Sequence, residues 1–407
     1  MSLSRFAGVE VPSLPTAARR PRWTPTVLAY AAFVPTGLVT VLLGPLLPTL
    51  EARWNLTDIQ AGYLVTAQFV GSLLATVFSG AIVARVRFRW SMVLGLGLMA
   101  VGAAALLAHR YAWGLASVFV YGMGTGVTVP TTNLLIARAA PQRSSASLNL
   151  LNFFWSAGAV ACPFLLAIFQ PAGHLATFLY GVAAFIGLII VALLTLPLEI
   201  PDLVPASTSP RSQSLLALLR SPIAAVLGAL FFVYVGTESA FGAWLASYAK
   251  RIATTASAAW VTVPSYFYFT LLLGRIAAPL TLRRLSDVRQ ARWGALLAVS
   301  GAAALLASNS LPAVIGAALL IGLGLSSLYP IAIGLLSSSF GSEAPRVAGV
   351  VFALSTLGGA IVPWLVGYLS TELGTLRLAL LVPFVGCCAI AALFWLSRYP
   401  DTTQPSG

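Results

Sequence analysis

The sequence predicts an all-α membrane protein with twelve transmembrane helices in two pseudo-symmetric six-helix bundles. The chain of 407 residues is 59% hydrophobic and only 8% charged, with a mean hydropathy of +0.92. Soluble globular proteins carry about 25% charged residues. The chain contains apolar stretches of the roughly 20 residues that a helix needs to cross the bilayer core. Its second half also repeats a pattern of its first half.

The apolar stretches favour helices over strands because they are long and apolar on all sides, whereas a membrane barrel shows short alternating segments. In the first half, the predicted spans are 25–49, 59–84, 90–109, 113–137, 146–170 and 174–196. In the second half, they are 221–248, 258–282, 291–309, 312–338, 347–370 and 375–397. We therefore expect a tail, a bundle, a linker, a second bundle and a short tail at 1–24, 25–196, 197–220, 221–397 and 398–407.

The internal repeat is read from glycine and proline residues that recur at a constant offset of 200 positions. The members of the first half are Gly122, Gly124, Pro130, Gly158 and Pro163. Their partners in the second half are Gly322, Gly324, Pro330, Gly358 and Pro363. Paired bundles of this kind are the architecture of alternating-access transporters, in which one bundle rocks against the other around a central site.

The net charge of +13 reflects membrane topology and does not indicate nucleic acid binding. With an even number of spans, both termini lie on one side of the membrane. The basic residues on that side are Arg5, Arg19, Arg20, Arg22, Arg85, Arg87, Arg89, Arg138, Arg143, Arg211, Arg220, Arg283, Arg284, Arg289, Arg292, Arg346 and Arg398. Those on the other side are Arg53, Arg110, Lys250, Arg251 and Arg377. Since positive loops stay in the cytoplasm, both termini are expected there, next to anionic lipid headgroups.

The segments outside the spans read as tails and a linker. Residues 1–24 lack the apolar core and cleavage site of a signal peptide. Prolines and hydroxyl residues fill 197–220, as in a linker, and 212–220 is expected to form a short amphipathic helix. The three cysteines lie in apolar segments, and no disulfide is expected.

Enzymes and metalloproteins are excluded by what the sequence lacks. It shows no nucleophile with a base, no paired carboxylates, no phosphate-binding loop and no cysteine or histidine spacing typical of a metal site. We expect no catalytic residue, no cofactor and no metal.

The two charges inside predicted spans are the most informative residues. Glu238 lies about 25 Å from the inner end of the seventh span, and Arg275 about 12 Å above the inner surface. A carboxylate at membrane depth costs about 2.5–3.5 kcal/mol on insertion scales, so it needs a partner, water, a substrate or a proton. Because the two depths differ by roughly 13 Å, a direct salt bridge is not expected. Glu238 is therefore predicted to bind substrate and a coupling ion, with a structural hydrogen bond as the alternative; Arg275 is a gate or structural charge, with a substrate role equally open.

Amide and aromatic side chains complete the predicted site. Amides present paired donors and acceptors that match sugar hydroxyls, and aromatic faces stack on pyranose rings. The predicted substrate-binding residues are Gln68, Asn133, Asn149, Asn152, Trp155, Glu238, Trp244, Tyr266 and Tyr329. Asn149 and Asn152 are three positions apart and share one helix face.

These residues lie in stretches that resemble the major facilitator superfamily. Within it, they resemble the fucose–galactose–glucose:proton symporter family and its relatives among the sodium-dependent glucose transporter-like proteins. The most specific stretches are LNLLNFFWSAGAVACP (148–163) and FVYVGTESAFGAWLASY (232–248). The resemblance implies that Gln68, Asn133, Asn152, Trp155 and Glu238 line a central cavity. It implies a monomeric transporter of a hexose-type sugar in the bacterial inner membrane, with H⁺ as coupling ion and lipids as its other partners.

The chain also departs from the family pattern. Ala84 stands where the superfamily's loop after the second helix has an acid, and Gly44 and Val129 stand where fucose permease-like members carry acids. A facilitator or sodium-coupled symporter therefore stays open, as does a multidrug or amphiphile exporter of the same fold. A non-transporting receptor or lipid scaffold is disfavoured, because a rigid scaffold needs no paired rocking design.

The charge distribution makes a topology prediction. Single cysteines placed at residues 205–212 should resist an impermeant maleimide in intact cells and react in inside-out vesicles, because the linker is cytoplasmic. A cysteine at position 110, on the opposite side, serves as the control and should show the reverse pattern. Ready labelling of the linker from outside would invert the orientation.

Overall fold

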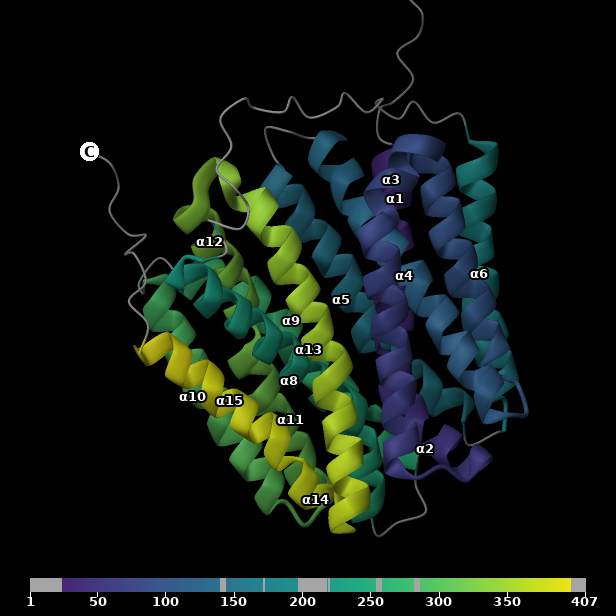
Figure 1. Ribbon diagram of the computed structural model, residues 1–407. Coiled ribbons are helices and arrows are strands. Elements are labelled where there is room, and N and C mark those ends of the chain that lie inside the picture. Colours follow the sequence, from purple (N-terminus) through teal and green to yellow (C-terminus); the bar gives the residue numbers. More distant parts are fainter. Residues whose placement is uncertain are drawn as a thin grey trace, which may run out of the picture.

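Two groups of helices lie side by side in the computed structural model, which describes residues 24–139, 144–170, 173–196, 218, 220–253, 258–281 and 286–396 (Figure 1). The first group holds α1 (Thr24–Val41), α2 (Leu43–Trp54), α3 (Asp58–Ala105), α4 (Tyr111–Ala139), α5 (Ser144–Phe169) and α6 (Leu175–Thr195). The second begins with α8 (Pro222–Ile252), η2 (Ala258–Thr262), α9 (Val263–Thr281) and α10 (Asp287–Ala307). It continues with α11 (Leu311–Leu325), α12 (Leu328–Phe340), η3 (Gly341–Glu343), α13 (Ala344–Leu373), α14 (Leu376–Ala379) and α15 (Leu381–Leu396).

The predicted all-α fold class with two bundles is confirmed for the described residues. We call the end of the molecule where α1 begins and α15 ends the proximal end, and the opposite end, which carries α14 and the end of α2, the distal end (Figure 1). Most of the predicted linker, including residues 212–217 and 219 of the expected helix, lies outside the described residues.

Nine helical segments of the described chain, or ten if the bent pair α1–α2 counts as one span, are long and apolar enough to cross a membrane. One of them, Leu311–Leu373, has 63 residues, which is about 95 Å of helix against a bilayer core of about 30 Å. The chain turns back within this segment at Gly341, whose φ is +51°. One segment therefore covers more than one passage, and the number twelve stays a prediction.

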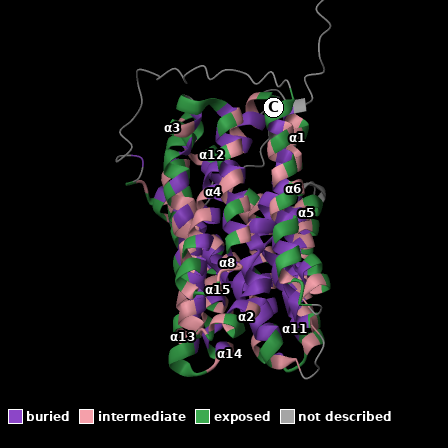
Figure 2. Cartoon of the chain, turned by 90° about the vertical axis from the view of Figure 1, so that its right-hand side faces the viewer, coloured by how far each residue is buried: buried purple, intermediate pink, exposed green. Residues whose placement is uncertain are grey.

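The outward faces of the helices carry the apolar surface that such a fold needs in lipid. Figure 2 shows buried residues between the helices and exposed residues on their outer sides. Large apolar side chains on these outer faces include Val77, Ile168 and Leu188, which are 66%, 68% and 69% exposed. Exposed apolar surface of this extent marks contact with lipid.

Four predicted spans differ in continuity from the structure. The second and third predicted spans run together as α3, which is kinked at Arg87 (φ 67°, ψ 164°) and contains two candidate spans, Asp58–Val83 and Arg85–Ala105. The first predicted span is broken between α1 and α2, which are bent by 43°. The span predicted at 312–338 is broken between α11 and α12.

Both breaks have a proline as their local cause. Pro45 and Pro330 each lack the N–H that would bond the carbonyl four residues earlier, at Val41 and Ser326. The matching Pro130 lies inside the continuous helix α4. The two halves of the repeat therefore differ where α11 gives way to α12.

The repeated glycines perform the same packing task in both bundles. A Cβ at Gly122 would collide with the backbone carbonyl of Gln68, and one at Gly322 with that of Phe267. Small residues of this kind let membrane helices approach closely. The 200-position repeat is thus a repeat of helix contacts, between α4 and α3 in one bundle and between α11 and α9 in the other.

The third glycine pair repeats this arrangement at the contact between the first and fifth predicted helices of each half. Gly158 of α5 packs on the carbonyl of Val34, and Gly358 of α13 packs on the carbonyl of Phe232. Both bundles therefore use a glycine where the helix that contacts the other bundle meets its own first helix.

These contacts predict a clear difference between glycine positions. Gly122→Ala and Gly322→Ala should each destabilise the protein by ~1–3 kcal/mol, because the added carbon overpacks a backbone contact. Gly97→Ala and Gly316→Ala, where a Cβ meets nothing within 4 Å, should be neutral or slightly stabilising, since alanine favours helix. Thermal unfolding of the detergent-purified variants measures the difference. Equal melting temperatures for the four variants would contradict the assigned packing.

Candidate functional site

The two intramembrane charges form an ion pair. Nη2 of Arg275, on α9, lies 3.9 Å from Oε2 of Glu238, on α8, and the two side chains are 21% and 17% exposed. The expectation that no direct salt bridge forms is therefore wrong.

Unequal helix lengths explain the error. Counted from the proximal helix ends, Glu238 and Arg275 differ in depth by about 15 Å. Counted from the distal ends, at Ile252 and Val263, they lie about 21 Å and about 18 Å deep. Because α8 has 31 residues and α9 has 19, only the distal ends give comparable depths.

Tyr234 connects this ion pair to the break between α11 and α12. Its hydroxyl donates to the carbonyl of Leu325 at 3.1 Å, and it also interacts with the side chains of Glu238 and Arg275. The last carbonyls of a helix lack donors within the helix, so the tyrosine satisfies a group that the break leaves open. The sequence analysis missed Tyr234, although it lies one turn before Glu238 on the same helix face.

Aromatic rings surround the ion pair. The ring of Tyr329, at the start of α12, lies 5.6 Å from that of Tyr234 and 5.3 Å from that of Phe231. Tyr329 is half-buried. The predicted residue Tyr329 and the ion pair therefore belong to one group of side chains.

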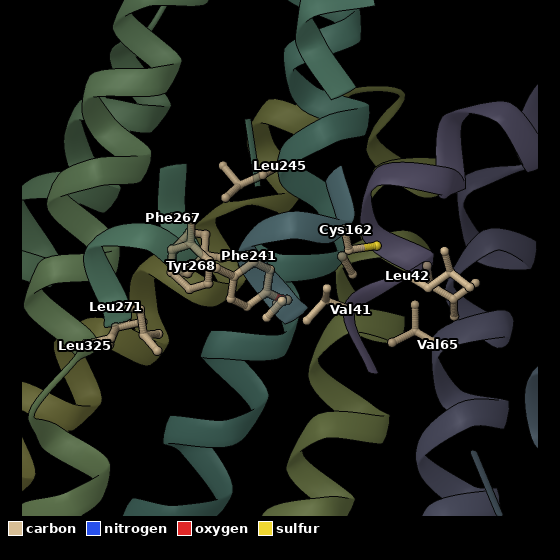
Figure 3. Packing of buried hydrophobic residues seen from close by; sticks show 14 of the residues in the cluster. Val41, Leu42, Val65, Cys162, Phe241, Leu245, Phe267, Tyr268, Leu271 and Leu325 are labelled. Carbon is tan, nitrogen blue, oxygen red and sulfur yellow. The ribbon is translucent and has the colours of Figure 1, made fainter. Parts of the chain in front are cut away.

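Phe241, Phe267 and Tyr268 form an aromatic cluster, which Figure 3 shows. Along α8 and α9 these residues lie closer to the distal helix ends than Glu238 and Arg275 do. The ring of Phe267 lies 6.4 Å from that of Phe241 and 5.0 Å from that of Tyr268. Figure 3 shows Cys162 of α5 and Val41 of α1 beside this cluster, on the side of the first bundle. Apolar packing thus fills the space between the bundles distal to the ion pair.

The Nε atom of Arg275 is buried and has no hydrogen-bond partner among the residues that the structure describes. A buried donor without a partner costs about 1–3 kcal/mol. This group is therefore able to gain stability from a water or ligand oxygen.

Asn149, Asn152 and Trp155 lie in the proximal half of α5. Asn149 and Asn152 are exposed and Trp155 is half-buried. Asn152 shares its helix face with Ser156 and Ala159, at i+4 and i+7, and these two residues are 2% and 0% exposed. The face of α5 that carries Asn152 is therefore buried in the distal part of the helix and exposed in the proximal part.

The uncovered face of α5 does not point to lipid. Leu150, Leu165 and Ile168, on the opposite side of the helix, are 46%, 38% and 68% exposed and form the apolar outward face. The asparagines therefore face the interior side of α5.

The asparagines and Arg275 occupy similar depths on facing helices. The Ser265 hydroxyl on α9 donates to the Val160 carbonyl on α5 at 2.9 Å, which fixes where the two helices meet. From this contact toward the proximal end, Asn152 lies about 12 Å away along α5 and Arg275 about 15 Å away along α9. The two bundles thus bring amides and an ion pair to one level.

The polar side-chain atoms of two predicted site residues already have hydrogen-bond partners within the protein. Gln68 is 4% exposed; its Nε2 donates to the Thr40 carbonyl at 2.7 Å, and its Oε1 accepts from the Tyr121 hydroxyl at 3.2 Å. Trp244 is 0% exposed, and its Nε1 donates to the Pro363 carbonyl at 2.9 Å. These contacts favour structural roles for both residues.

The two remaining predicted residues make contacts outside the group around the ion pair. Asn133 is half-buried, and its amide donates to the Val129 carbonyl one turn earlier at 2.9 Å. The ring of Tyr266 lies 5.8 Å from that of Phe164, at the contact between α9 and α5. No group of three or more potential metal ligands occurs in the described part of the chain.

The comparisons with known proteins agree on one family. The family described as Major Facilitator Superfamily matches residues 29–308. A glucose/galactose transporter of Brucella abortus is 26% identical over 380 residues, which cover 88% of this chain and 90% of that protein. The L-fucose-proton symporter of Escherichia coli is 24% identical over 400 residues, covering 88% and 89%.

Solved structures show the same fold. The crystal structure of the E. coli fucose:proton symporter aligns with a TM-score of 0.64 and 19% identity, covering 93% of this chain and 100% of that one. The structure of a D-xylose-proton symporter aligns with a TM-score of 0.75 and 14% identity, covering 94% and 98%. The family and these relatives are transporters and not enzymes.

Proposed function

We propose that this chain, which belongs to the Major Facilitator Superfamily, is a secondary active transporter that carries a hexose-type sugar across the bacterial cytoplasmic membrane. The named relatives, a glucose/galactose transporter and a fucose symporter, support the substrate class. The arginine distribution supports a cytoplasmic proximal end. The protein acts as a monomer by alternating access around the level of Glu238 and Arg275.

The observation that carries the proposal is that the ion pair and the exposed asparagines share one level between the bundles. Asn149 and Asn152 supply amides from α5, and Glu238, Arg275 and Tyr329 supply polar groups from the second bundle. A sugar presents hydroxyls as both donors and acceptors, which amides and a carboxylate match. Its hydroxyl oxygens also suit the buried Nε of Arg275, which has no partner in the described chain.

Trp155 completes the site on the side of the first bundle. It is three positions from Asn152 and half-buried, and its backbone packs against Gly37 of α1. Helix packing thus fixes the backbone that carries this aromatic ring, and such a ring suits the apolar face of a pyranose. Gln68 and Trp244 are left out of the proposed site because protein groups already satisfy their polar atoms.

We propose that proton coupling acts by replacing Arg275 with a proton as the partner of the Glu238 carboxylate. In this structure the carboxylate pairs with Arg275. When a proton binds Glu238, the guanidinium is released and its donors become free for sugar oxygens. Breaking a buried pair without replacement is costly, so proton and sugar binding become mutually favourable.

The proposed sugar contact makes a binding prediction. Asn152→Ala should weaken binding by roughly tenfold, because it leaves sugar hydroxyls and site groups without partners, and 1.4 kcal/mol corresponds to one decade. Leu150→Ala, on the outward face of the same helix, is the matched control and should leave affinity unchanged. Thermal-shift titration of purified protein with D-glucose, D-galactose and L-fucose gives the apparent affinities. Unchanged affinity in Asn152→Ala would remove this residue from the site.

The coupling proposal makes a second prediction. In proteoliposomes, Glu238→Gln should exchange radiolabelled sugar across the membrane but lose accumulation driven by a proton gradient, because glutamine cannot cycle a proton. Glu372→Gln, which alters an exposed carboxylate at the distal end, should accumulate sugar normally. Retained exchange in Glu238→Gln demonstrates a folded carrier.

Accumulation by Glu238→Gln would show that this residue is not the coupling group. Wild-type uptake that ignores both proton and sodium gradients would instead identify a facilitator, with Glu238 serving sugar binding or structure alone. Sodium-driven uptake would replace the proton in the proposal.

A further inference from the structure

We propose that Asp58 and Arg251 form a latch between the bundles that sets the resting conformation of this transporter as closed at the distal end. The latch lies at the distal end, away from the sugar site. Its role is to stabilise one of the two alternating states in the absence of substrate.

The geometry of the ion pair is that of a strong charge-assisted contact. Arg251, at the end of α8, donates from Nη1 to Oδ2 of Asp58 at 2.9 Å and from Nη2 to Oδ1 at 2.5 Å. Ser370 of α13 donates a further, short hydrogen bond to Oδ2. Bidentate arginine–carboxylate pairs fix geometry as well as adding energy. Asp58 therefore receives donors from two helices of the opposite bundle.

The position of Asp58 in its own helix strengthens the contact. It is the first residue of α3, directly after the capping residue Thr57. The positive end of the helix dipole favours a negative charge there. Its side chain is 14% exposed while that of Arg251 is 40% exposed, so the acid is the better shielded partner.

Further hydrogen bonds join the bundles beside the ion pair. The Ser247 hydroxyl donates to Glu51 at 3.4 Å, and Lys250 donates to the Pro48 carbonyl at 3.1 Å. The backbone N–H of Ile59 donates to the Thr371 hydroxyl at 3.0 Å.

Close packing supports these bonds. Gly44 of α2 packs on the carbonyl of Gly242 of α8, and Gly367 of α13 packs on the carbonyl of Asp58. The polar bonds and the packing form one interface that must separate as a unit when the distal end opens.

The distribution of acids in the sequence makes the distal interface the place where an acid of the first bundle pairs with the second bundle. The only acids among residues 25–196 are Glu51 and Asp58, and both contact the second bundle at the distal end. The first bundle has no acid near its proximal end, so it can offer only cations to a pair there. An acid of the first bundle can therefore pair with a cation of the second bundle only when the distal end is closed.

An interaction that is present in only one of two states shifts the population toward that state. The latch must break before the distal end opens, so its loss favours the distal-open state. Exposed single ion pairs contribute little, but this pair is bidentate and has a third donor. We expect loss of the pair to raise the ratio of distal-open to distal-closed molecules by roughly three- to tenfold.

The test measures the separation of the distal ends without any sugar. Spin labels are attached to His109→Cys and Ser310→Cys, exposed positions at the distal ends of the two bundles, in protein whose native cysteines are replaced by serine. Asp58→Asn and Arg251→Gln should each move population to longer distances in double electron–electron resonance. The double variant should match the single variants, since each removes the same pair.

Arg377→Gln is the matched control. Arg377 is also a distal arginine of the second bundle, but its bonds go to Tyr248, Ser308 and Asn309 of the same bundle. Its loss should leave the distance distribution unchanged.

A second measurement needs no substitution in the latch. Raising ionic strength from low salt to about 1 M screens the partly exposed pair and should shift the wild-type labels in the same direction. Wild-type distances in both Asp58→Asn and Arg251→Gln, or an equal shift in Arg377→Gln, would overturn the latch. Because no sugar is present, this result is independent of the proposed substrate and coupling.

Discussion

The fold depends on the requirement that a backbone carbonyl or N–H inside a bilayer be satisfied by the protein, because hydrocarbon offers no partner. Unbroken helices meet this requirement by themselves. The two broken helices do not, and each break is met by a side chain from a neighbour in the same bundle. Gln68 bonds the Thr40 carbonyl near the α1–α2 break, and Tyr234 bonds the Leu325 carbonyl at the end of α11.

This requirement separates structural polar residues from functional ones. Gln68 has both ends of its amide bonded to protein groups and is almost fully buried. Tyr234 is also buried, yet it contacts the ion pair as well as the helix break. A change in the partner of Glu238 would therefore alter the surroundings of Tyr234, whose hydroxyl bonds the Leu325 carbonyl at the break between α11 and α12. In the proposed coupling, protonation of Glu238 would act on the break through this tyrosine. This break is also where the second bundle departs from the symmetry of the first, whose α4 is continuous.

The two bundles meet through different chemistry at different depths. At the distal end the contacts are ionic and polar, through Asp58, Arg251 and Ser370. Farther in, aromatic packing around Phe267 and Tyr268 fills the space. Proximal to that, the interior face of α5 is uncovered at Asn149 and Asn152. From the distal end inward, the contacts thus change from ionic and polar to aromatic, and the exposed amides follow.

The sequence by itself determined the helical class and the two bundles, because apolar length and a constant glycine offset are properties of the chain. The family followed from the resemblance of stretches such as 148–163 and 232–248. It also found Glu238 and Arg275, since charges in apolar stretches are conspicuous. Only the tertiary structure decided that these two residues pair, because depth counted from helix ends fails when α8 and α9 differ in length. It alone showed that Gln68 and Trp244 bond within the protein and that Asp58 meets Arg251. Such partners are far apart in sequence, and which face of a helix meets which neighbour is fixed by packing rather than by hydrophobic length.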